Sequence, residues 1–198
     1  MRNLLFILLL AFSNTLAAQP VLTKQETVNY IQKKLNEGVG HKSSYNKLMD
    51  ADVRINDCSF TYNEVVNNDK TKPNYREDYN TYTFNILHIK SFVSVEDGDL
   101  SYLRINLTGK TGLIKSYTKQ YNPKFKNQWV NDSRYDNGGY YDTKLDRYDF
   151  ESTSTITRST DFILIRYLKS DATNFNKLKK AFEHLHDLCK AEDDPFGE

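Results

Sequence analysis

The chain has 198 residues, a formal net charge of +1 and a mean hydropathy of −0.69. This length is typical of a single domain. A charge so close to zero gives no general attraction to phosphate backbones or anionic lipid, so we expect no nucleic-acid partner. The aromatic residues, which are 14 Tyr, 11 Phe and 1 Trp, must supply much of the buried surface.

The first residues, MRNLLFILLLAFSNTLAAQ, have the pattern of an export signal. Arg2 supplies the positive charge, Leu4–Phe12 is a short apolar run, and Thr15–Ala18 offers small residues for cleavage. The apolar run has about nine residues, against the roughly 20 that a membrane-spanning helix needs. We therefore expect a signal peptide at residues 1–18, no membrane insertion after its cleavage, and a periplasmic or secreted single domain at residues 19–198.

A helix is predicted over residues 23–38. Thr23 and Glu26 form a T-x-x-E capping box, which is typical of a helix start. The apolar residues that follow recur at helical spacing, and they are Val28, Ile31 and Leu35. Gly38 provides a stop at the C-terminal end.

Residues 51–168 change to an alternating apolar pattern, which predicts strands. Asn56-Asp57 indicates a tight turn, because the apolar parity changes there and Cys58 then shares its face with Phe60 and Tyr62. Two hairpins are predicted next: the run 92–95 turns into 103–107, and 103–107 turns again into 113–121.

The rest of the chain mixes one irregular segment with two regular elements. Residues 122–151 have no sustained period and are predicted to form a long loop or a loosely paired hairpin. A strand near 153–157 and an apolar strand at 162–168 follow. A helix is predicted over about 174–190, with one apolar stripe consisting of Leu178, Ala181, Phe182, Leu185, Leu188 and Cys189.

The order of these elements resembles the pleckstrin-homology-like split barrel, in which a C-terminal helix covers one end of two packed sheets. The segments that carry the resemblance are YTFNILHIKSF, LSYLRINLTGKTG, DFILIRYLKSD and NKLKKAFEHLHDLC, within roughly residues 45–190. The ending LKKAFEHLHDLCKAEDDPFGE is similar to that of small secreted proteins of the Bacteroidetes type. The resemblance implies an α+β fold, a mostly antiparallel two-sheet barrel or sandwich with an N-terminal helix and a C-terminal amphipathic helix. It implies no activity, because the basic phosphoinositide pocket has no counterpart here.

The last helix brings two histidines and a cysteine together in the sequence. His184 and His186 are two positions apart and point about 200° away from each other on a helix, so they cannot share one metal. Cys189 lies in the apolar stripe, where a thiol packs as a small hydrophobe or joins a disulfide. We therefore expect neither a metal site nor a nucleophile in this helix.

The segment 122–151 holds two further candidate sites. Its carboxylates depart from the calcium-loop spacing and alternate with Lys and Arg, so we expect a solvated loop; they are Asp132, Asp136, Asp142, Asp146 and Asp149. Its aromatic residues could form a platform for a glycan or peptide, although the local core of a hairpin is the favoured interpretation; they are Trp129, Tyr121, Tyr135, Tyr140 and Tyr141.

The chain contains no phosphate-binding glycine loop, no G-x-S-x-G motif and no C-x-x-C pair. We therefore expect no catalytic residues, no cofactor and no enzymatic activity. The predicted function is that of an exported, non-enzymatic binding or interaction module, whose partner is a protein or glycan in the cell envelope or outside the cell. The alternative is an enzyme with a scattered active site that leaves no local signature.

Cys58 and Cys189 are the two cysteines of the chain, and both are predicted to face the core. Export implies an oxidising compartment, in which two inward-facing thiols can form a disulfide. The bond requires the two Cα atoms to lie within about 7 Å. A disulfide and two separate buried thiols both fit the sequence.

Overall fold

The computed structural model describes residues 22–68, 75–125, 128–131, 133–134, 136, 138–142 and 145–194, and it gives the backbone alone at 122–125, 128–131, 140–142 and 145–149. Its elements, in chain order, are α2 (Lys24–Asn36), β1 (Asn46–Asn56), β2 (Ser59–Asn68), β3 (Tyr75–Asn85), the 3₁₀ turn η1 (Ile86–His88), β4 (Ile89–Asp97), β5 (Leu100–Leu107), β6 (Gly112–Phe125), β7 (Gln128–Asn131), β8 (Gly139–Asp142), β9 (Leu145–Thr160), β10 (Phe162–Leu168) and α3 (Asn174–Asp193).

Helix α2 begins at the predicted capping box. The Thr23 hydroxyl accepts a hydrogen bond from the Glu26 amide at 3.2 Å, and the Glu26 carboxylate accepts one from the Thr23 amide at 2.8 Å. These bonds satisfy amide groups that a helix start otherwise leaves unpaired. The predicted apolar face of this helix is buried, which confirms the helix and its orientation.

The strands form two antiparallel sheets and a short two-stranded pair. The five-stranded sheet has the order β1-β2-β3-β6-β9, the three-stranded sheet has the order β10-β5-β4, and β7 pairs with β8. The predicted α+β architecture with helices at both ends is confirmed. The sheets are not closed into a barrel, so of the two predicted forms the sandwich is the one observed.

One of the two predicted hairpins is confirmed and the other is wrong. β4 and β5 pair across a turn at Gly98, whose φ of +69° suits glycine. β5 and β6, however, lie in different sheets, since β5 pairs with β10 while β6 pairs with β3 and β9. The alternating pattern gives each strand its buried face, but it does not say which strand lies beside it.

Two strand pairs, β5/β10 and β6/β9, form one long ribbon that bends where the chain changes sheets. The Leu107 amide donates to the Asp161 carbonyl at 2.8 Å at this bend. Gly112 lies inside it, where an added Cβ would approach the side chains of Leu107 and Thr160 to 2.8 and 3.0 Å. The absence of a side chain at Gly112 therefore lets the two sheets approach each other.

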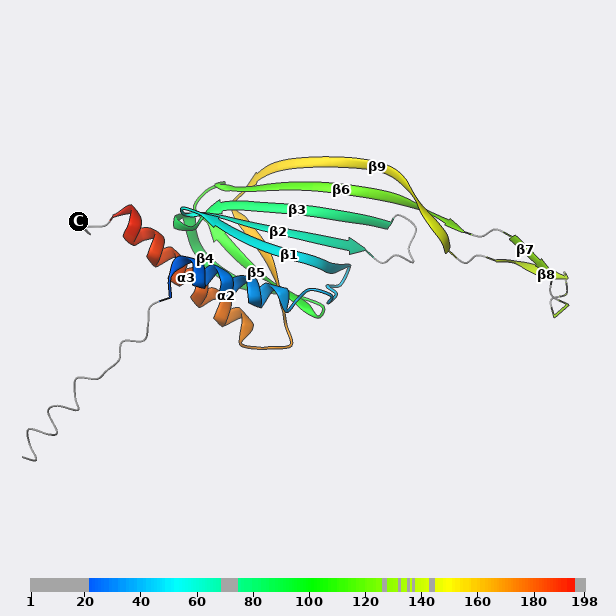
Figure 1. Cartoon of the computed structure of the whole chain (residues 1–198), viewed down its shortest axis with the longest axis horizontal. Coiled ribbons are helices and arrows are strands. Elements are labelled where there is room, and N and C mark those ends of the chain that lie inside the picture. The colour runs from blue at the N-terminus through cyan, green and yellow to red at the C-terminus, as the bar shows by residue number, and fades with distance from the viewer. Residues whose placement is uncertain are drawn as a thin grey trace, which may run out of the picture.

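The irregular segment 122–151 contains a long hairpin. β6 and β9 continue to pair as far as Phe125 and Leu145, with register shifts at Gln120/Tyr121 and Lys124/Phe125. β7 and β8 pair farther out, and the hairpin projects away from the helices (Figure 1). The shifts and the short strands explain why the sequence shows no sustained period here.

Helices α2 and α3 pack against each other beneath the sheets (Figure 1). The stripe of α3 enters the core with Leu178, Ala181, Phe182, Leu185 and Cys189 buried, and with Leu188 half-buried. The Phe182 ring lies 5.1 Å from the ring of Phe60 and 6.2 Å from the ring of Phe92, measured between centroids. The last helix therefore joins both sheets into one core.

Candidate functional site

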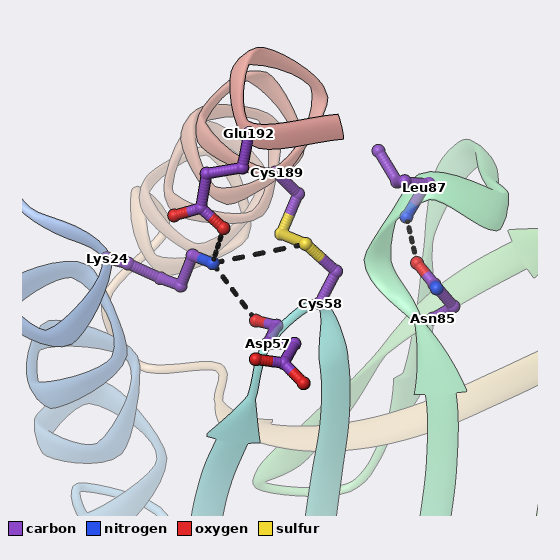
Figure 2. Close-up of a disulfide and its surroundings, with 7 residues drawn as sticks. All are labelled: Lys24, Asp57, Cys58, Asn85, Leu87, Cys189 and Glu192. Carbon is purple, nitrogen blue, oxygen red and sulfur yellow. Dashed lines mark hydrogen bonds and ion pairs between the residues drawn. A yellow bond between two sulfur atoms is a disulfide. The ribbon is translucent and has the colours of Figure 1, made fainter. Parts of the chain in front are cut away.

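The two cysteines form a disulfide (Figure 2). Cys58 lies in the tight turn between β1 and β2, and Cys189 lies near the end of α3, with their Cα atoms 5.7 Å apart. Asp57, the residue before Cys58, has a φ of +53°. This left-handed residue makes the turn as tight as the parity change indicates.

Lys24 ties three elements together beside the disulfide (Figure 2). Its ammonium group lies 2.5 Å from the Glu192 carboxylate, 3.1 Å from the Asp57 carbonyl and 4.0 Å from the Cys58 sulfur. These contacts join the start of α2, the β1–β2 turn and the end of α3. The arrangement is that of a structural joint between the two ends of the described chain.

The two histidines of α3 lie apart, as their spacing predicts. The His184 ring contacts the Leu22 carbonyl at 2.8 Å, and the His186 ring lies 3.6 Å from the Asp187 carboxylate. Within the described residues, no three His, Cys, Asp or Glu side chains are grouped as metal ligands. His184 therefore contacts the segment before α2, and His186 contacts the next residue of its own helix.

The two candidate sites of segment 122–151 lie largely outside the described side chains. Of the predicted acidic cluster, only the side chain of Asp136 is described, and it is exposed. Of the predicted aromatic platform, only the side chain of Tyr121 is described. Tyr121 belongs to a different surface, which the pairing of β3 with β6 brings together.

This surface lies on the face of the five-stranded sheet that points away from the three-stranded sheet. The register of β3 and β6 places Tyr75 opposite Tyr121, Glu77 opposite Lys119 and Tyr79 opposite Tyr117. Alternate residues of a strand share one face, so all six side chains lie together. We call this set the tyrosine patch; its members are Tyr75, Glu77, Tyr79, Tyr117, Lys119 and Tyr121.

Glu77 organises the hydroxyl groups of the tyrosine patch. Its carboxylate accepts hydrogen bonds from Tyr75 at 2.9 Å, from Tyr79 at 3.1 Å and from Tyr121 at 3.4 Å. Burial, together with the bond to Glu77, raises the pKa of Tyr75 to about 12. Tyr75 therefore stays protonated at neutral pH, and the hydrogen bonds to Glu77 hold the rings of Tyr75, Tyr79 and Tyr121 in position.

The rings of the tyrosine patch form two cross-strand pairs. The Tyr75 and Tyr121 centroids are 5.5 Å apart, and those of Tyr79 and Tyr117 are 5.8 Å apart. Lys119 lies 5.0 Å from the Tyr79 centroid, and a hydrogen bond to Tyr79 raises the pKa of Lys119. The positive charge of Lys119 balances the negative charge of Glu77, so the tyrosine patch has no net charge.

Part of this aromatic surface is open to solvent. The Tyr117 side chain is 37% exposed. Phe150 of β9 is 61% exposed, and its ring lies edge-on to the Tyr121 ring with 6.1 Å between centroids. Tyr117 and Tyr121 are four positions apart on β6, which corresponds to about 14 Å along the strand. The exposed ring surface is therefore long enough for a short oligosaccharide or an extended peptide.

The opposite face of the sheet carries a buried ion pair. The Glu64 carboxylate accepts hydrogen bonds from Tyr62 at 2.9 Å, Tyr82 at 3.0 Å and Asn80 at 3.1 Å, and it pairs with Arg166 of β10. Burial, and then the Glu64 charge, raises the pKa of Tyr82 far above its usual value.

The Glu64 carboxylate raises the pKa of two of its partners, Arg166 and Tyr82. Burial opposes the charge on Arg166, but the adjacent Glu64 carboxylate outweighs burial, and the pKa of Arg166 is raised. Arg166 stays charged and Tyr82 stays protonated, so neither group exchanges a proton readily. This pattern is typical of an ion pair that joins two sheets.

Comparisons with known proteins identify no relative: no protein-family model, curated protein or solved structure matches the chain. None of the helices in the described ranges is long and apolar enough to cross a membrane. The fold and the tyrosine patch together define an α+β sandwich that presents a charge-balanced aromatic face to solvent.

The sequence does contain a signal for this patch. Tyr75–Tyr79 reads YREDY and Tyr117–Tyr121 reads YTKQY, so both segments have two tyrosines flanking a central charge, and the two charges are opposite. The pattern gains meaning only when β3 is known to pair with β6. Those strands are separated by β4 and β5 in the chain, so the sequence alone does not bring the two segments together.

Proposed function

We propose that the protein is an exported, non-enzymatic binding module that holds a neutral glycan on the tyrosine patch. The observation that carries the proposal is the arrangement of Tyr75, Tyr79, Tyr117 and Tyr121 around one opposite-charge pair. Ring faces suit the apolar faces of sugar rings, while hydroxyl, carboxylate and ammonium groups suit their hydroxyls. A charge-balanced site favours a neutral ligand over a charged one.

The proposal of export rests on the N-terminal pattern around Arg2 and the apolar run Leu4–Phe12. The Cys58–Cys189 disulfide is compatible with an oxidising compartment. We expect the native protein to begin near Ala18 or Gln19, which N-terminal sequencing measures directly. A native chain that keeps Met1 would contradict export.

The resemblance to the pleckstrin-homology-like split barrel and to small secreted proteins of the Bacteroidetes type belongs to this proposal. It is supported by two antiparallel sheets followed by a C-terminal helix. It concerns the fold and the source alone and implies no ligand. Screening the mature protein for turnover tests the non-enzymatic part, which one robust reaction lost on a single His or Asp substitution would overturn.

The binding proposal is tested with a glycan array, followed by calorimetric titration of the oligosaccharide that binds best. We expect Tyr117→Ala to raise the dissociation constant about tenfold or more, which corresponds to about 1.4 kcal/mol. Tyr45→Ala is the matched control, since Tyr45 is 83% exposed and lies outside the patch. Equal effects of the two variants would contradict the site, and an array without any bound glycan would contradict the ligand class.

A further inference from the structure

The two sheets have four edge strands, and side chains from the helices bond to the backbone of two of them. The Gln32 side chain of α2 donates to the Ala51 carbonyl and accepts from the Val53 amide, each at 2.7 Å, so it caps the edge of β1. The Asn174 side chain of α3 donates to the Leu168 carbonyl of β10 at 2.9 Å. The edges of β4 and β9 have no further strand beside them in the described part of the chain.

The edge of β4 carries features that discourage pairing. A register shift lies at Lys90, and Glu96 and Asp97 place two negative charges at the other end of the strand. Bulges and charges are the devices with which proteins protect sheet edges. Helix α3 also packs beside this strand.

The edge of β9 lacks such protection between residues 152 and 160. This segment reads STSTITRST, contains no proline and one charge, and pairs with β6 without a register shift. Residues 150–159 are exposed, and Ile156 at the centre is 60% exposed. Threonine and isoleucine favour strands. A row of unpaired backbone groups on such an edge is a template for another strand.

We infer that β9 pairs antiparallel with β9 of a second copy of this chain, about a two-fold axis at Ile156. A two-fold axis perpendicular to the sheet keeps the same face of both copies on the same side. Two residues that pair across the axis must therefore both be odd-numbered or both be even-numbered. Centring on Ile156 meets this condition and places the exposed isoleucine against its own copy. The remaining pairs are Thr155 with Thr157, Ser154 with Arg158, Thr153 with Ser159 and Ser152 with Thr160.

This register is self-complementary in chemistry as well as in geometry. The exposed apolar side chain of Ile156 is removed from water on the axis. Arg158 meets Ser154 of the copy, so no like charges face each other, and the other pairs join hydroxyl side chains, which stabilise sheets. The two five-stranded sheets become one continuous sheet.

The pairing also places the two tyrosine patches on the same face of that sheet. If the proposed function holds, one dimer can engage two sites of a repeating glycan. The inference of the dimer itself does not depend on the ligand, because the oligomeric state is measured without one.

The test is sedimentation equilibrium of the mature protein over a range of concentrations. We expect a concentration-dependent dimer, and we expect Ile156→Lys to be monomeric because it places two like charges on the axis. Val93→Lys is the matched control: it adds the same charge to an exposed valine of β4 and should leave the dimer intact. A monomeric wild-type protein, or dissociation by Val93→Lys alone, would overturn the inference.

Two substitutions at Ser154 test the register. Ser154 and Arg158 of one chain lie about 14 Å apart along the strand, so a charge at position 154 reaches Arg158 of the copy alone. We expect Ser154→Glu to lower the dimer dissociation constant about fivefold and Ser154→Arg to raise it about fivefold, because each change acts at two symmetric pairs. Circular dichroism verifies that both variants fold. Equal dissociation constants for the two variants would overturn this register.

Discussion

Glu64 and Arg166 form an ion pair that joins the two sheets in the interior. The Glu64 side chain is fully buried, and that of Arg166 is 8% exposed. Because water reaches neither group freely, each charge depends on the other and on the hydrogen bonds from Tyr62, Tyr82 and Asn80.

We expect Arg166→Met to lower the free energy of unfolding by about 3–5 kcal/mol, because it leaves Glu64 buried without its cation. The double variant Glu64→Gln with Arg166→Met should lose much less, since no charge then remains in the interior. Urea unfolding of the wild type, both single variants and the double variant measures the coupling. Additive losses would show that the two side chains do not depend on each other.

The sequence contains part of this site. Glu64 shares its strand parity with Phe60, Tyr62 and Val66, so the alternating pattern places a carboxylate among core residues. Arg166 interrupts the apolar run FILIRYL on the parity of Phe162 and Leu164. Two opposite charges, each inside an apolar strand, indicate that each of these side chains has a charged partner in the interior. Which charges meet depends on how the sheets stack, and strand patterns carry no information on that.

The sequence predicts where helices and strands lie better than it predicts which strands pair with each other. The capping box at Thr23 and the stripe of α3 locate both helices, because helical periodicity and capping are local properties. The predicted pairing of β5 with β6 is wrong, since a turn at residues 108–111 serves a hairpin and a change of sheet equally well. The capping of β1 by Gln32 has no sequence signature at all.

This cap leads to a prediction for the contact between α2 and β1. Gln32→Met keeps the length of the side chain but removes both hydrogen bonds to Ala51 and Val53. We expect the free energy of unfolding to fall by about 1–3 kcal/mol, because two backbone groups lose their partners. Thermal unfolding measures this loss.

Gln25→Met is the control for that experiment. Gln25 lies on the same helix and, among the described residues, its side chain bonds to Asn29 alone, so its change should stay within about 0.5 kcal/mol. If the two variants lose equal stability, the loss reflects helix propensity and the capping of β1 contributes nothing measurable.

The disulfide acts on the molecule as a whole, since it closes a loop between residues 131 positions apart. We expect reduction to lower the free energy of unfolding by about 5 kcal/mol, because the open unfolded chain gains entropy. The denatured, unreduced protein should show no free thiol, and two after reduction. Guanidinium unfolding with and without reductant measures the change in free energy, and thiol titration counts the free thiols.

The control for the disulfide is the double variant Cys58→Ala with Cys189→Ala, whose stability should not respond to reductant. Two thiols in the unreduced protein would contradict the bond. A reductant-sensitive double variant would show that the reductant acts elsewhere.

The packing of α2 on α3 determines when the protein can fold. The first and last described elements contact each other, and Phe182 and Leu185 of α3 fill the space between the two sheets. A nascent chain that still lacks α3 leaves the facing rings of Phe60 and Phe92 in water, so its sheets have no closed core. Contacts so distant in sequence form late and make folding slow. We therefore expect the two sheets to gain a closed core only after α3 has been synthesised, so a chaperone that binds earlier would meet strands without a core.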